Sequence, residues 1–130
     1  MATGYGATPA LRLKRSSQSG SKAMTAAWQT IYEESSNDAF LFWAGLVDLT
    51  NLQAGDTLNI KFSKKVGPDE NYIVFDQTSY SGDEIPTEHK SIKIGHIPNT
   101  YGVKIELQQS AGVLRDLYCE FYDAKRLGAG

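Results

Sequence analysis

The strongest constraint on the fold is an alternation of apolar and polar side chains near the C-terminal end. Over residues 101–108 the apolar positions are Tyr101, Val103, Ile105 and Leu107, and the positions between them carry Gly, Lys, Glu and Gln. Successive side chains of a β-strand point to opposite faces of its sheet, so this pattern indicates a strand with one buried and one solvated face. Residues 116–122 repeat the pattern after the turn residues 110–112. We therefore predict an antiparallel hairpin at this end of the chain.

Five further segments that are typical of strands precede this hairpin. They cover residues 26–32, 39–49, 57–66, 72–78 and 91–97, and Gly, Pro, Asn and Asp cluster between them. Residues 39–49 would also tolerate a short helix, but their turn-rich flanks and the bend expected at Gly45 favour a strand. No window keeps helical periodicity over three turns. Short strands at this spacing predict an all-β fold: a single antiparallel β-sandwich of jelly-roll or immunoglobulin-like type, with a barrel as the alternative.

The first 24 residues differ in composition from the rest. Fourteen of them are Gly, Ala, Ser, Thr or Pro, and they include four basic residues and no acid. Residues 25–130 hold nine basic and 15 acidic residues, so the net charge of −2 divides into +4 and −6. A segment so poor in apolar side chains buries too little surface to offset the entropy of ordering. We predict an extended basic arm over residues 1–24, a β-sandwich domain over residues 25–126 and a C-terminal tail over residues 127–130.

The arm contains one short alternation, in which Leu11 and Leu13 are interleaved with Arg12 and Lys14. Such a strand can add to the edge of a neighbouring sheet, where the leucines pack on the partner and the basic side chains meet its acidic groups. The partner-binding residues that we expect are Tyr5, Leu11, Arg12, Leu13, Lys14 and Arg15. We expect the partners to be copies of the chain and other proteins of the same assembly. A nucleic acid is not expected as a partner, because four positive charges give weak, salt-sensitive attraction and the acidic body would repel it.

No group of residues in the sequence has the spacing of a catalytic or metal site. Cys119 lies between Leu117 and Phe121 in an alternating segment, which is typical of a small buried hydrophobe. A single Cys also excludes an intramolecular disulfide. His89 and His96 match no metal-binding spacing, and the sequence contains neither a G-x-S-x-G elbow nor a phosphate-binding loop. We predict no enzyme activity, no catalytic residue, no cofactor and no metal.

Three segments carry a resemblance to known proteins: residues 45–58 (GLVDLTNLQAGDTL), 79–82 (SYSG) and 101–113 (YGVKIELQQSAGV). They resemble small β-sandwich proteins of viruses and archaea, over about residues 25–124. The resemblance implies a structural module, such as a capsid decoration protein or another virion accessory protein of a tailed phage or an archaeal virus. Members of that class often clasp a neighbour by an N-terminal arm, and the partner implied is the major capsid protein. The location implied is the virion.

The sequence contains no segment typical of export or of insertion into a membrane. The first 20 residues lack the apolar h-region of a secretory signal, and no apolar stretch reaches the ~18–20 residues that span a bilayer. We therefore expect a protein that is made in the host cytoplasm without a signal peptide and that contacts no membrane.

Two other classes of protein stay open. In one, the chain is a subunit of an extracellular filament, and its Leu11–Leu13 segment completes the sheet of the next subunit. In the other, it is a carbohydrate- or ligand-binding module, because tyrosine rings combine a flat apolar face with a polar tip. The tyrosines that support this second class lie near loops or on solvated faces: Tyr72, Tyr80, Tyr101, Tyr118 and Tyr122.

Overall fold

Secondary structure is entirely β in the part of the chain that the structure describes. The computed structural model describes residues 14–35, 40–42, 44–83, 90–99, 101–123 and 125–126. These residues form strands and turns and no helix, and their strand pairings are antiparallel throughout. The predicted all-β class is therefore confirmed. No helix of these residues is long and apolar enough to cross a membrane.

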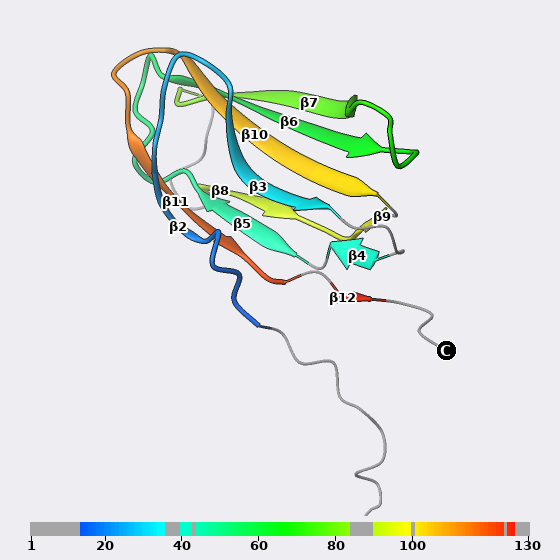
Figure 1. Cartoon of the computed structure of the whole chain (residues 1–130). Helices are drawn as coiled ribbons and strands as arrows, with labels where there is room; N and C mark the ends of the chain where they lie inside the picture. Colours follow the sequence, from blue (N-terminus) through cyan, green and yellow to red (C-terminus); the bar gives the residue numbers. More distant parts are fainter. Residues whose placement is uncertain are drawn as a thin grey trace, which may run out of the picture.

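Two four-stranded sheets form two layers, one above the other in Figure 1. The first sheet has the order β3 (Gln29–Ser35), β10 (Gly102–Ala111), β6 (Thr57–Lys65) and β7 (Ile73–Ser81). The second has the order β2 (Gly20–Ala23), β11 (Asp116–Phe121), β5 (Gly45–Asp48) and β8 (Ser91–Ile94). A smaller sheet of β12 (Lys125–Arg126), β4 (Phe40–Phe42) and β9 (Ile97–Asn99) continues the second, because its strands adjoin β11, β5 and β8 in the chain.

The strands pair as nested hairpins. β6 pairs with β7, β5 with β8, β3 with β10, and β2 with β11. Each pair encloses the preceding pair in the sequence, and successive pairs alternate between the two sheets. In the sequence, the β6–β7 hairpin is therefore the innermost pair, and β2 with β11 is the outermost pair.

Apolar side chains that alternate along the strands meet between the two layers. The first sheet contributes Tyr32, Leu58, Ile60, Ile105 and Leu107, and the second contributes Val47, Ile92, Leu117, Cys119 and Phe121, all of them buried. Burying one such aliphatic or aromatic side chain stabilises a fold by about 1.5–3 kcal/mol. The alternation in residues 57–63, 101–108 and 116–121 thus has the physical cause predicted for it, one buried face per strand.

The apolar segment predicted as one strand over residues 39–49 is divided into β4 and β5. The division falls next to Gly45, whose backbone packs against the ring of Phe121. A Cβ atom at Gly45 would lie 2.7 Å from Cδ1 of Phe121, so a larger residue would force this ring out of the core. The glycine therefore permits close packing at the start of β5.

The predicted boundary between arm and body, at residue 24, is wrong for residues 14–24. β2 pairs with β11 over Gly20–Ala23, and Met24 is 3% exposed within the core. A Ser- and Gly-rich edge strand is stable here because its backbone hydrogen bonds to β11 do not depend on side chains, and Met24 anchors its end. The other parts of the predicted arm and tail, residues 1–13 and 127–130, lie outside the described residues.

Candidate functional site

One side of the two layers ends in strands with an unpaired backbone edge. Among the described residues, β7 pairs with β6 alone, β8 with β5 and β9 with β4. The strand order places β7 and β8 at corresponding ends of the two sheets. An edge strand offers a row of free N–H and C=O groups on which another strand can pair. We call the space between β7 and the β8–β9 segment the edge groove.

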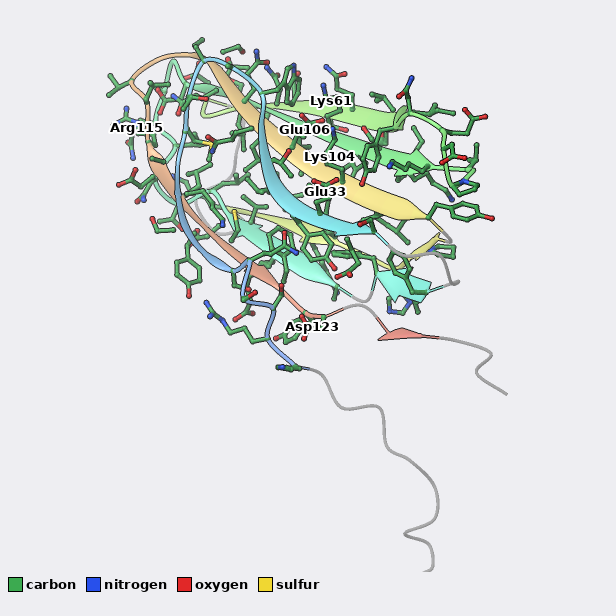
Figure 2. All side chains as sticks on the ribbon, viewed as in Figure 1. Glu33, Lys61, Lys104, Glu106, Arg115 and Asp123 are labelled. Carbon is green, nitrogen blue, oxygen red and sulfur yellow. The ribbon has the colours of Figure 1, made fainter. Side chains whose placement is uncertain are left out.

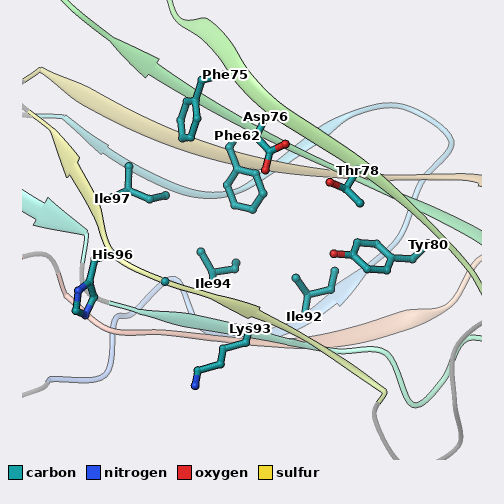
Figure 3. Close-up of a pocket in the computed structure, with 11 residues that line it drawn as sticks. Phe62, Phe75, Asp76, Thr78, Tyr80, Ile92, Lys93, Ile94, His96 and Ile97 are labelled. Atoms are coloured by element: carbon teal, nitrogen blue, oxygen red, sulfur yellow. The ribbon is translucent and has the colours of Figure 1, made fainter.

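The edge groove consists of two adjoining pockets with volumes of about 260 and 430 Å³. Both pockets are lined by Phe75, His96 and Ile97. Figure 3 shows Phe62 and Tyr80 on one side of the first pocket, with Ile92 and Ile94 pointing toward them from the other side. Lys93 and His96 point away from this space (Figure 3). Asp76, Thr78 and Tyr80 also face the first pocket, so its lining is mixed, whereas the lining of the second pocket is mainly apolar.

A bulge in β7 brings Phe75 into the groove. The register shifts so that Phe62 lies opposite Asp76 while Ser63 lies opposite Val74, which leaves Phe75 as an extra residue in β7. The ring of Phe75 lies 6.2 Å from that of Phe62, centre to centre. Bulges re-aim side chains and occur frequently at sheet edges. Here the bulge adds an aromatic side chain to the groove without removing Asp76 from its lining.

The apolar side chains around the second pocket are left largely in solvent. Phe75 is 48% exposed, Ile73 is 53% exposed and Val66 is 64% exposed. Lys64 of β6 crosses this pocket and donates a hydrogen bond to the carbonyl oxygen of Pro98 in β9 at 3.2 Å. A contiguous, exposed apolar surface of this kind typically marks an interaction site.

The ionisable residues of the groove are few. They come from both of its sides, and no group of three or more His, Cys, Asp or Glu that could hold a metal occurs among the described residues. Cys119 is fully buried in the core, as predicted, and burial raises the pKa of its thiol to about 11. The thiolate is the nucleophilic form, so burial lowers the reactivity of this thiol.

Two of the predicted partner-binding residues, Lys14 and Arg15, contact their own chain. The carbonyl of Lys14 accepts a hydrogen bond from the Asp123 amide at 2.8 Å, and Arg15 forms a backbone bridge with Tyr122. The Arg15 side chain pairs with Glu120 at 3.7 Å. It also hydrogen-bonds the Tyr118 hydroxyl. The structure therefore places both residues along the end of β11 and not at the edge groove; Tyr5, Leu11, Arg12 and Leu13 lie outside the described residues.

Two tyrosines on the outer faces, Tyr72 and Tyr118, contact cations. The ammonium groups of Lys104 and Lys65 lie 4.6 and 5.0 Å from the ring centre of Tyr72, and the Tyr72 hydroxyl donates a hydrogen bond to Glu33 at 2.7 Å. Figure 2 shows Lys104 and Glu33 along the first sheet. The Arg15 guanidinium lies 5.8 Å from the ring centre of Tyr118. These contacts involve two of the five tyrosines on which a carbohydrate-binding module was predicted, and that class of protein stays a prediction.

The sequence prediction missed the edge groove. One signal pointed to it: Ile73, Val74 and Phe75 are consecutive apolar residues, without the alternation of a half-buried strand. Comparison of the chain with models of protein families found no match, and comparisons with curated proteins and with solved structures found none either.

Proposed function

We propose that the chain is an eight-stranded jelly roll. When β4–β5, β8–β9 and β11–β12 are each taken as one interrupted strand, eight strands divide equally between two layers. The nested pairs then give the order first–eighth–third–sixth in one layer and second–seventh–fourth–fifth in the other. This order is what results when one long antiparallel hairpin is rolled up, and it favours a jelly roll over an immunoglobulin-like sandwich.

For its function, we propose a structural role in assembly, as a virion component of the capsid decoration or accessory type. The observation that carries this proposal is the long, exposed edge of β7, which begins with the apolar residues Ile73, Val74 and Phe75. Monomeric proteins blunt or cover such edges, because an uncovered edge leads to association. The partners proposed are copies of the chain and other virion proteins, with the major capsid protein foremost. Attachment would use residues 1–13, because residues 14–24 belong to the body.

The test compares virus particles banded on a density gradient from cells that produce the full-length chain or a chain lacking residues 1–13. The full-length chain is expected in the particle band and the truncated chain is expected to be absent from it. The matched control lacks residues 127–130 and should remain in the band. The truncated chain keeps β2 and Met24, so circular dichroism should show an intact fold. Truncated chain in the particle band at the full-length level would contradict the proposal.

A subunit of an extracellular filament is the second candidate. Its support is that the attachment segment and the edge groove lie on opposite sides of the body. Lys14, where the segment joins the body, lies beside the β2–β11 edge, and the edge groove lies at the other end of the strand order. A contact between opposite sides of identical subunits is heterologous, and it closes into a ring or continues as a filament. Electron microscopy of the concentrated protein distinguishes rings or particles from filaments.

A further inference from the structure

We propose that the edge groove binds residues 10–13 of a second copy of the chain, added as a strand along β7. The inference rests on the proposed assembly function and names the receiving site. It joins two observations: an unpaired edge strand on the body that begins with exposed apolar residues, and a short segment outside the described residues whose leucines alternate with a basic residue.

β7 is the receiving strand because the neighbouring edges are short and carry lysine or proline, whereas β7 is long and has a single bulge, at Phe75. β8 has four residues with an exposed Lys93, and β9 has three residues with Pro98 in the middle. Lysine and proline are the residues by which natural edge strands prevent pairing. β7 has nine residues, contains no lysine or proline, and carries Asp76 as its one charged residue. Its length also exceeds that of the segment it would bind.

The side-chain spacing of the segment matches the groove. Leu11 and Leu13 project from the same face of a strand, about 7 Å apart. The groove offers two adjoining pockets that share Phe75, His96 and Ile97; the second is mainly apolar, and in the first Phe62, Ile92 and Ile94 lie beside polar side chains. One leucine can therefore enter each pocket, while Arg12 points to the solvated face. Pro9 precedes this strand, at the position where a proline is tolerated.

The occupant is a second copy because the segment starts at the other side of the body. Lys14 is held against Asp123 beside the β2–β11 edge, and β2 is three strand spacings from β8 in the sheet order, about 14 Å. Residues 10–13 directly precede Lys14, so they extend at most about 13–14 Å from it and Leu13 lies within about 4 Å of it. That reach is too short to bring both leucines into the groove of their own chain, whereas the groove of an adjacent copy can lie next to Lys14.

The first test titrates a synthetic peptide of residues 1–13 into the chain that lacks these residues. We expect saturable binding, with chemical-shift changes in NMR spectra confined to β7, the β8–β9 segment and the adjoining end of β6. Peptides with Leu13→Asp should bind at least tenfold more weakly, and a peptide with Thr3→Asp should bind normally. Absence of binding, or shift changes centred on the β2–β11 edge, would overturn the proposal.

The second test changes the groove in the full-length chain. Phe75→Asp should convert oligomers into monomers in sedimentation velocity and weaken peptide binding at least tenfold. Leu114→Asp is the matched control, since Leu114 is 53% exposed in the β10–β11 turn, and it should change neither. Should Phe75→Asp unfold, the peptide titration decides alone.

Three results separate the two proposals. If particles require residues 1–13 but Phe75→Asp leaves both association and peptide binding intact, the groove is wrong and the assembly function stands. If the truncated chain enters particles normally, the assembly function fails. If the full-length chain is a monomer at every concentration and its β7 amides are protected from hydrogen exchange, the segment binds within its own chain and the second-copy assignment is wrong.

Discussion

Asp56 joins two turns at one end of the layers, and we expect its replacement by Ala to destabilise the fold strongly. The Asp56 carboxylate is 2% exposed. It accepts hydrogen bonds from the Gln53 amide at 2.8 Å and the Val113 amide at 3.1 Å. It also accepts from Nε of Arg115 at 2.7 Å, at the end of the layers labelled in Figure 2. Asp56→Ala leaves all three donors without their acceptor.

The magnitude follows from what each donor loses. Breaking a buried ion pair by removing one partner costs about 3–5 kcal/mol. The Arg115 side chain is 27% exposed, so it can regain contact with water, and the lower end of that range applies. We therefore expect Asp56→Ala to lower the free energy of unfolding by about 3 kcal/mol, a large part of the roughly 5–15 kcal/mol typical of a domain. The melting temperature should fall by about 10 °C.

The assay is urea unfolding at pH 7, followed by tryptophan fluorescence. Asp69→Ala is the matched control, because Asp69 is an exposed acid in the β6–β7 turn. That control should change the free energy of unfolding by less than about 0.5 kcal/mol. The reasoning is refuted if Asp56→Ala and Asp69→Ala have equal effects.

The same carboxylate predicts a pH dependence. The hydrogen bond from Arg115, followed by those from the Gln53 and Val113 amides, holds the pKa of Asp56 below its ordinary value of 3.8, against the opposing effect of burial. A folded-state pKa below the unfolded value means that the stabilisation is complete above pH 3.8 and is lost as the pH falls through the folded-state pKa. The stability difference between wild type and Asp56→Ala should therefore be constant from about pH 5 to pH 8 and shrink below about pH 4.

Two further substitutions test the packing around the core. The Tyr32 hydroxyl is buried without a hydrogen-bond partner among the described residues, so Tyr32→Phe should raise the free energy of unfolding by about 1 kcal/mol in urea titrations; a loss of more than about 1 kcal/mol would show that the hydroxyl is satisfied. Gly112 and Gly55 both have positive φ angles, +86° and +89°. A Cβ atom added at Gly112 would lie 2.0 Å from Oδ1 of Asp56, whereas a Cβ atom added at Gly55 would have no atom within 4 Å. Gly55→Ala should cost about 1–2 kcal/mol through backbone strain, and Gly112→Ala about 2 kcal/mol more through the clash; equal melting temperatures would contradict this account.

Much of the fold was predictable because most strands are buried on one face. The alternation of Leu58 with Asn59 and Ile60, and of Ile105 with Glu106 and Leu107, corresponds directly to side chains inside and outside the layers. Local sequence carries this information, because strand geometry alone assigns alternate residues to opposite faces.

β2 escaped prediction because its stability comes from elsewhere in the chain. Residues 20–23 bury little of their own surface, and their pairing with β11 is a backbone interaction that any sequence without proline can make. Composition was therefore a poor guide to order in this segment. The single strong side-chain signal was Met24, the buried anchor at its end.

The edge groove could not be predicted for a different reason. Phe62, Phe75 and Ile97 come from three strands that are separated in the sequence, and they meet because of the strand order. A run such as Ile73–Val74–Phe75 is typical of a fully buried strand. Its position at the end of the first sheet leaves it exposed, and that position is a property of the whole topology.

The nesting of the strand pairs also determines when each part of the protein can form during synthesis. Lys64 and Ile73 pair across a short turn, whereas Gly20 must wait for Cys119. During synthesis, β6–β7 is therefore the first pair of strands of which both members have left the ribosome. The β2–β11 pairing, which fixes residues 14–24, is the last of the nested pairs. Long-range pairings of this kind make folding slow. The base of the N-terminal segment becomes fixed only after β11 has emerged, so a chain terminated before β11 would lack the anchored segment that assembly is proposed to require.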